Sequence, residues 1–274
     1  MLINMNEFLN TGSNQLVLIY TLILGVIIGS FLNTLIYRLP IMLGFVEKNH
    51  NFKKFNLCVP RSFCDKCYIK IPFYLNIPII SYLILKGKCF SCKSSISFKY
   101  PAIEILTGLV FIWLTLFINF SYELIFISLL SCALIVLAFI DLKYLVLPNT
   151  LTYSLICFGL LINFFYSITP FLSAILGCSL GYLGFLFIEK VFYLIKKSEG
   201  LGRGDAKLVA AIGAWVGLNY LPVVILLAAC TGIIFFISLI LVRKIPIHQS
   251  LNLPIPFGAF LASSCIIIIP LIKY

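Results

Sequence analysis

Two aspartates lie at the ends of long apolar runs, where an acidic side chain is costly. Asp141 ends the apolar run 132–141, and Asp205 closes the stretch GLGRGD (200–205) and opens the next apolar run. Acidic residues in or beside membrane-spanning segments are rare, and their default interpretation is functional. A structural role is the alternative for each, because Asp141 could pair with Lys143 and Asp205 could cap the helix that it begins.

A pair of carboxyl groups a few ångströms apart can hydrolyse a peptide bond. The two cannot both ionise at low cost, so one holds a proton while the other takes a proton from the attacking water. The protonated carboxyl then donates a hydrogen bond to the developing oxyanion. Because one aspartate alone cannot divide these roles, we predict that Asp141 and Asp205 together are the catalytic residues of a two-aspartate protease.

Five of the ten cysteines gather in one hydrophilic stretch. Four of them form two Cys-x-x-Cys knuckles, Cys64 with Cys67 and Cys89 with Cys92, and Cys58 is left over. Each knuckle places two sulfurs about 3.5 Å apart, which suits a shared ion with Zn–S bonds of roughly 2.3 Å. The spacing is close to that of zinc ribbons, so these four cysteines are predicted to bind zinc. Disulfide or redox use is the alternative, and a reducing cytosol disfavours it.

The composition excludes a water-soluble globule. Of 274 residues, 62% are hydrophobic and 11% are charged, against roughly 45–50% and about 25% in soluble domains. The apolar blocks are long enough to cross a membrane as helices and lack the alternation of a barrel. The sequence therefore predicts an all-α polytopic membrane protein with about eight transmembrane helices and a small cytoplasmic zinc-binding loop domain. The eight apolar segments are 15–37, 102–120, 124–140, 151–166, 171–195, 206–216, 221–242 and 257–271.

The basic residues predict the orientation of the chain. Nineteen of the 20 lysine and arginine residues fall in the odd-numbered gaps between these segments or in the segment ends that border them, and such gaps are cytoplasmic by the positive-inside rule. Both aspartates then lie at the cytoplasmic face. The net charge of +11 indicates membrane lipids and not nucleic acid, because its location follows topology. We expect three parts: a periplasmic tail with the first transmembrane helix (1–37), the Cys-rich cytoplasmic loop (38–101) and a seven-helix protease domain (102–274). The tail has no basic region, so the first segment is expected to be a retained anchor.

Further motifs accompany these residues along nearly the whole chain. They are GSFLNTLIYRLP (29–40), the two knuckles, NIPIISYL (76–83), KGKC (86–89), YPAIE (100–104), Ile140-Asp141, Leu147-Pro148, EGLGRGDAKL (199–208) and IPFG (255–258). In this order they resemble the type IV prepilin peptidases, a family of bacterial GxGD-type aspartyl proteases that are often also N-methyltransferases. The sequence departs from the family's pattern at Asn149, where Asp is common, and at Asp65 and Ala259, where Pro is common.

The resemblance implies that Asp141 and Asp205 are catalytic and that Cys64, Cys67, Cys89 and Cys92 are the zinc ligands. It implies cleavage, after a Gly, of the basic leader of type IV prepilins or of the pseudopilins of type II secretion, in the bacterial cytoplasmic (inner) membrane with the active site facing the cytoplasm. It also implies methylation of the new N-terminal amine with S-adenosylmethionine as methyl donor, and it associates the zinc-binding loop 38–101 with this activity. The sequence does not identify the residues that bind the donor. The alternatives are another GxGD intramembrane protease and a proton-coupled transporter.

Three charged residues within the matching motifs have two interpretations. Arg38, Glu104 and Lys207 could tune the aspartates or hold substrate backbone, or they could be interface anchors.

Overall fold

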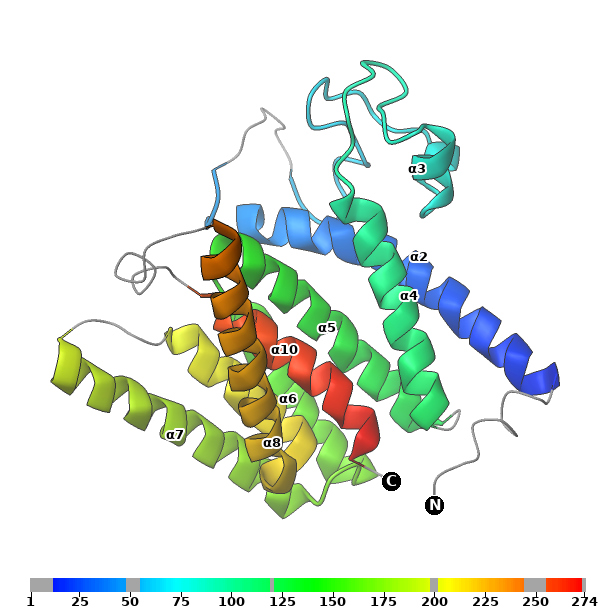
Figure 1. Ribbon diagram of the computed structural model, residues 1–274. Helices are drawn as coiled ribbons and strands as arrows, with labels where there is room; N and C mark the ends of the chain where they lie inside the picture. The colour runs from blue at the N-terminus through cyan, green and yellow to red at the C-terminus, as the bar shows by residue number, and fades with distance from the viewer. Residues whose placement is uncertain (1–11, 48–54, 119–120, 198–201, 244–254, 273–274) are drawn as a thin grey trace. The chain divides into compact units, whose positions relative to one another are not determined.

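The computed structural model describes residues 12–47, 55–118, 121–197, 202–243 and 255–272, which are helical apart from turns, loops and two isolated bridges (Figure 1). Most of the expected N-terminal tail and the start of the GLGRGD stretch lie outside these residues. No strand occurs in the described ranges, which confirms the all-α class. The elements are α2 (Gly12–Met42), η1 (Phe73–Asn76), α3 (Ile80–Ile84), α4 (Lys99–Phe117), α5 (Tyr122–Tyr144), α6 (Asn149–Tyr166), α7 (Phe171–Lys196), α8 (Arg203–Arg243), α10 (Phe257–Ile268) and η2 (Ile269–Leu271).

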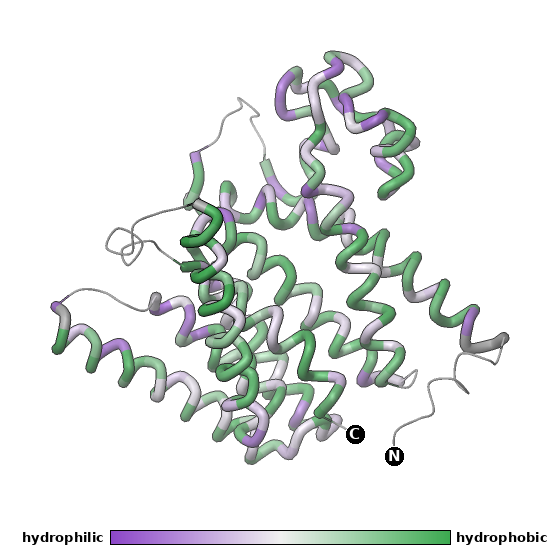
Figure 2. Tube along the Cα trace, viewed as in Figure 1, coloured by the Kyte–Doolittle hydropathy of each residue, from purple (hydrophilic) through white to green (hydrophobic). Residues whose placement is uncertain are grey.

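Within the described ranges, six helices are long and apolar enough to cross a membrane, namely α2 and α4 to α8. Figure 2 shows hydrophobic residues along most of their length and hydrophilic residues gathered in the segment between α2 and α4. The chain is thus an integral membrane protein, but the count of eight spans is not confirmed. Two expected segments, 206–216 and 221–242, form the two helical arms on either side of the non-helical residue Gly217, which together carry the label α8, and the segment 257–271 forms a shorter apolar helix.

Helix α8 contains one non-helical residue, Gly217, with φ 75° and ψ 175°. Residues with a side chain rarely adopt this conformation, which explains the glycine. The yellow and orange arms of α8 meet at this bend in Figure 1. The backbone groups around the bend are bonded from outside α8: the Leu218 N–H donates to Ser173 Oγ (3.0 Å), and Thr169 Oγ1 donates to the Trp215 carbonyl (2.8 Å). Such compensation is required of irregular backbone at membrane depth.

The chain divides into two compact units, residues 1–124 and residues 125–273. In the first unit α2 packs on α4. A Cβ atom on Gly29 would lie 2.8 Å from the Glu104 Cα, so the two helix backbones are in direct contact there. Small residues at helix interfaces permit such contact in membrane proteins. This packing brings Asn33 of α2 to Tyr100 of α4, whose carbonyl accepts a hydrogen bond from the Asn33 side chain (3.0 Å).

In the second unit α8 packs against α6, α7 and α10. Its N-terminal arm is almost fully buried from Ala206 to Val216. Buried polar groups join it to α6: the Asn163 side chain donates to the Ala214 carbonyl (2.8 Å), and the Trp215 indole donates to the Leu155 carbonyl (2.9 Å). This tightly packed arm fixes the position of the turn that carries Asp205.

Candidate active site and metal centre

Asp141 lies in the last turn of α5 and is 5% exposed. Its Oδ2 atom accepts a hydrogen bond from the Ala259 backbone N–H (3.0 Å), which belongs to the first turn of α10. No side chain of the N-cap residue, Pro256, bonds the start of α10. The Ala259 N–H also reaches the Pro256 carbonyl (3.2 Å), so the Asp141 carboxylate is a second and shorter acceptor at a helix start whose first N–H groups lack the usual partner four residues back. The N-terminus of α10 thereby holds this carboxyl group in place.

Asp205 lies in the first turn of α8 and is half-buried. Its backbone N–H donates to the Gly202 carbonyl (2.9 Å). The carboxyl groups of Asp141 and Asp205 are close enough to interact electrostatically. The structure therefore brings together two side chains that lie 64 positions apart in the sequence.

Leu147 joins the three helix ends at this place. A Cβ atom on Gly204 would lie 3.1 Å from Leu147 Cβ, and one on Gly258 would lie 2.9 Å from Leu147 Cδ1 and 3.0 Å from Asp141 Oδ2. The end of α5, the start of α8 and the start of α10 thus converge around one leucine. Glycine at position 258 leaves room for the Asp141 carboxyl group, and glycine at position 204 leaves room for Leu147.

The structural alternative for Asp141 was an ion pair with Lys143, and the position of Lys143 does not support it. Lys143 lies over the Tyr144 ring, 4.6 Å from its centroid, and among the described residues it forms no ion pair with Asp141. Asp205 follows the first residue of α8, Arg203, and so is not the residue that precedes the helix. An acidic group in the first turn still interacts favourably with the helix dipole.

Lys207 is bonded to α6, and among the described residues it forms no ion pair with either aspartate. Its ammonium donates to Asn149 Oδ1 (2.7 Å) and lies 5.2 Å from the centre of the Tyr153 ring. Asn149 is one of the three departures from the family's pattern, and this bond ties the start of α6 to the first turns of α8. A second departure, Ala259, provides the N–H that holds Asp141, a donor that a proline would lack.

The four knuckle cysteines converge in the first unit, and their sulfur atoms all lie within 4.8 Å of one another. We call Cys64, Cys67, Cys89 and Cys92 the cysteine cluster. All four are free thiols, and the Cys64 and Cys92 sulfurs are 3.9 Å apart, well beyond the roughly 2.05 Å of a disulfide bond. Four convergent sulfurs are the donor set of a tetrahedral structural metal site. The exposed Cys58 is not part of the cluster.

The two knuckles have the same backbone geometry. In each, an isolated bridge closes the turn, Phe63 with Lys70 and Lys88 with Ser95. The residue after the second cysteine has a positive φ in both knuckles, 56° at Tyr68 and at Lys93, and its N–H donates to the carbonyl of the first cysteine. This repeated turn points both sulfurs of each knuckle to the same side, as a shared ion requires.

The thiols of the cluster differ in acidity. The Ser94 side chain and backbone hydrogen-bond to the Cys92 sulfur and lower the pKa of this thiol to about 6. A hydrogen bond from the Ile69 backbone lowers the pKa of the Cys67 thiol, but desolvation and the neighbouring thiols outweigh it and raise the pKa to about 11. The cluster therefore holds thiolate and thiol together at neutral pH, and a bound cation would favour the thiolate at every position.

Arg38 and Glu104 act within the first unit. The Arg38 guanidinium, 5% exposed, donates to the carbonyls of Asn56 (2.7 Å), Leu57 (3.2 Å) and Pro60 (2.6 Å). It thereby anchors the segment that leads into the first knuckle. Glu104, 7% exposed, accepts the Ile79 N–H at Oε2 (2.8 Å).

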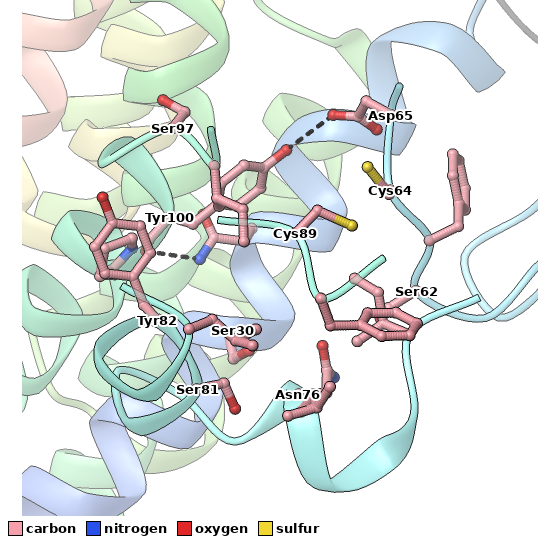
Figure 3. A pocket seen from close by; sticks show the side chains of 18 of the residues that line it. Ser30, Ser62, Cys64, Asp65, Asn76, Ser81, Tyr82, Cys89, Ser97 and Tyr100 are labelled. Atoms are coloured by element: carbon pink, nitrogen blue, oxygen red, sulfur yellow. Dashed lines mark hydrogen bonds between the residues drawn. The ribbon is translucent and has the colours of Figure 1, made fainter. Parts of the chain in front are cut away.

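A cavity of about 380 Å³ lies in the first unit between α2, α3, the start of α4 and the knuckles (Figure 3). Its lining includes Glu104, Ser81 and Asp65, together with Cys64 and Cys89 of the cysteine cluster. Asp65, the third departure from the family's pattern, accepts a hydrogen bond from the Tyr100 hydroxyl (3.4 Å). Sequence reasoning assigned no role to Ser81 or Ala259; both stand in or beside the motifs quoted above, and only the packing of distant helices reveals their contacts.

The fold and these groups define a class: a helical membrane protein with two interacting carboxyl groups in one unit and a four-cysteine cluster in the other. Residues 23–118 match the family model of the bacterial peptidase A24 N-terminal domain, and residues 128–237 match that of the type IV leader peptidase family. No solved structure matches this chain.

Three curated relatives are named prepilin leader peptidase/N-methyltransferase. The protein of Aeromonas salmonicida is 40% identical over 251 residues, covering 87% of this chain and 85% of the relative. That of Neisseria gonorrhoeae is 39% identical and covers 77% and 78%, and that of Stutzerimonas stutzeri is 37% identical and covers 93% and 91%. The chain belongs to this family of type IV leader peptidases, and is an aspartic peptidase of the membrane with N-methyltransferase activity.

Proposed function

We propose that this enzyme cleaves the basic leader of type IV prepilins or pseudopilins after a Gly, at the cytoplasmic face of the bacterial inner membrane, with Asp141 and Asp205 as the catalytic pair. It then methylates the new N-terminal amine with S-adenosylmethionine. The observation that carries the proposal is the convergence of the end of α5 and the starts of α8 and α10 around Leu147, with the Asp141 carboxyl group held by the N-terminus of α10.

The surroundings of the two carboxyl groups support a division of labour. Asp141 accepts the Ala259 N–H at a helix N-terminus, and such a position favours a negative charge. We assign Asp141 as the ionised group that takes a proton from the attacking water. Asp205 then holds the shared proton and donates a hydrogen bond to the carbonyl oxygen as negative charge develops on it. As the intermediate collapses, the leaving amine takes the proton that Asp141 received from the water, and the C–N bond breaks.

The chemistry of the substrate agrees with the predicted orientation. A pilin precursor carries a hydrophobic helix behind a basic leader, so its scissile bond lies at the cytoplasmic interface. Basic residues stay on the cytoplasmic side of a membrane, and the same rule predicts that the end of α5 and the start of α8 lie on that side.

The residues of the first unit fit the two groups that the proposal requires. Four convergent thiols suit zinc, which would tie the knuckles together as a structural ion. When bound, S-adenosylmethionine would supply an electrophilic methyl group on its sulfonium for the neutral N-terminal amine. The chain's own residues have to bind the donor and orient the amine.

The test of the catalytic pair uses all three aspartates of the chain. Purified protein in detergent is incubated with a pilin precursor, and mass spectrometry follows the loss of the leader. We expect Asp141→Asn and Asp205→Asn each to lower the cleavage rate by a factor of at least about 10³, since neither remaining carboxyl can fill both roles. Asp65→Asn, in the first unit, is the matched control and should cleave normally.

The same assay separates the alternatives. A cut after Gly at the leader junction supports a prepilin peptidase, whereas a cut within the hydrophobic helix would indicate another type of intramembrane protease. Substantial cleavage by either variant at position 141 or 205 would refute the catalytic pair. Proton-coupled flux in proteoliposomes without any cleavage would indicate a transporter.

A further inference from the structure

The cavity of the first unit has the size and chemistry of a small-molecule site. Its volume of about 380 Å³ falls within the range of ligand pockets, about 300–1,000 Å³. Apolar and aromatic residues make up about half of its lining, and polar residues make up the rest, including Glu104, Ser81 and Asn33. Figure 3 shows side chains from α2, α3, α4 and both knuckles around the same space.

One buried polar atom in this wall has no partner. The Ser81 side chain is 8% exposed, lines the cavity, and its hydroxyl forms no hydrogen bond within the described residues. A buried hydroxyl without a partner is unfavourable by roughly 1–3 kcal/mol. Since such groups are uncommon in folded proteins, each one requires an explanation, and a ligand that bonds Ser81 would provide it.

The same wall contains a strained turn. Ile79 has φ 60° and ψ −52°, and the Ile80 N–H donates to the Pro78 carbonyl across it, which makes a γ-turn. A β-branched residue in this region is a genuine outlier, and such strain gathers at ligand sites. The turn directs the Ile79 N–H to Glu104 Oε2 (2.8 Å) and begins the helix that carries Ser81.

Glu104 has acceptor capacity left for a cationic ligand. Besides the Ile79 N–H it accepts a hydrogen bond from the Ser30 side chain, whereas an ionised carboxylate offers about four acceptor positions. The guanidinium of Arg38, which also lines the cavity, is engaged with three backbone carbonyls. Asp65 and Lys66, both exposed, line the cavity with opposite charges. The buried Glu104 carboxylate is the remaining charged group, and it favours a ligand with positive charge.

We propose that this cavity is the binding site of the methyl donor, with the Glu104 carboxylate facing the donor's cationic groups, the Ser81 hydroxyl bonding one of its polar groups, and the aromatic wall covering the adenosine. S-adenosylmethionine carries an ammonium, a sulfonium and one carboxylate, so it has a net positive charge that complements Glu104. This assignment rests on the proposed methyl transfer and adds the site at which it takes place. Cys64 and Cys89 line the cavity too, so the cysteine cluster shapes one of its walls.

The test measures binding directly, apart from catalysis. Full-length protein in detergent, loaded with zinc, is equilibrated with radiolabelled S-adenosylmethionine, and unlabelled S-adenosylhomocysteine is used as competitor. We expect saturable binding at one site per chain. Ser81→Ala should weaken it roughly threefold to tenfold and Glu104→Gln roughly 10- to 100-fold, in line with the loss of a neutral and of a charged hydrogen bond. The amide oxygen of the introduced glutamine can still accept the Ile79 N–H, so the turn is kept.

Ser179→Ala is the matched control, because Ser179 lies on α7 in the second unit and bonds only within its own helix. All variants should retain zinc and cleave a pilin precursor normally. Wild-type binding that neither Ser81→Ala nor Glu104→Gln weakens would overturn the cavity assignment and leave methyl transfer standing. If these variants bind the donor more weakly only because they have lost zinc, the cavity assignment is overturned as well, since the effect of the substitution is then structural. A wild-type protein that cleaves but neither binds the donor nor methylates would overturn both the site and the methyl-transfer half of the proposed function.

Discussion

Gly258→Ala is the smallest change that should move Asp141. A Cβ atom there would lie 3.0 Å from Asp141 Oδ2 and 2.9 and 3.1 Å from the two methyl groups of Leu147. The leucine methyls can rotate away, but the carboxyl group is held by the Ala259 N–H (3.0 Å) and has to shift by a few tenths of an ångström to reach ordinary contact distance. Catalytic groups must be held within about 0.5 Å, and a displacement of about 1 Å lowers rates about 100-fold.

We therefore expect Gly258→Ala to lower kcat for leader cleavage about tenfold, which corresponds to about 1.4 kcal/mol in activation free energy. Stability should change little, because alanine favours a helix over glycine by up to about 1 kcal/mol and this offsets the adjustment of Leu147. The assay is steady-state cleavage of a pilin precursor, with thermal unfolding in detergent run beside it.

The control is Gly184→Ala on α7, where a new Cβ would meet nothing within 4 Å. It should cleave at the wild-type rate. If Gly258→Ala also cleaves at that rate while folding normally, the position of Asp141 does not limit the reaction, and the inferred role of the α10 N-terminus is refuted.

Three further predictions concern the donor to Asp141 and the metal bound by the cysteine cluster. Ala259→Pro removes one donor to Asp141 but introduces a residue that is tolerated in the first turn of a helix, so kcat should fall about tenfold with no loss of melting temperature. Removal of the metal from the cysteine cluster by a chelator should release about one zinc per chain, measured by mass spectrometry, and abolish donor binding while cleavage stays within about twofold. Zinc affinity should fall as the pH is lowered from about 8 to about 6, because the Cys67 thiol, with a pKa of about 11, must lose its proton on binding; calorimetry in two buffers measures the released protons.

The features that the sequence predicted are those with a local signal. Membrane insertion follows from apolar composition, and the cysteine cluster follows from two short knuckles whose turns are self-contained. The pair of aspartates was predicted because Asp141 ends one apolar run and Asp205 opens another. The contacts of each carboxyl group depend on three helices that meet only in the folded chain.

The number of spans was harder to predict because counting assumes that each apolar run crosses the membrane separately. The polar break after Val216 marks a division, and the non-helical Gly217 separates the two helical arms of α8 at this place. The segment from Phe257 is apolar but too short to count as a span. Its importance lies in its first turn, since the Ala259 N–H meets a carboxyl group 118 positions away. The pattern of residues within one segment does not predict a contact between two distant segments. Nor does it predict that the Ser81 hydroxyl is buried without a hydrogen-bond partner.

The two reactions have a fixed chemical order, and this order makes the two units separable by experiment. The nitrogen to be methylated is an amide until the leader is removed, and an amide lone pair is delocalised into the carbonyl. Only hydrolysis by the aspartate pair turns it into an amine that can attack a sulfonium methyl group. A variant of Asp141 should therefore yield neither product, whereas Glu104→Gln should yield pilin that has lost its leader and lacks the added methyl group. The reverse pattern, methylation of a precursor that still carries its leader, would require a different nitrogen and would contradict the shared substrate on which both assignments rest.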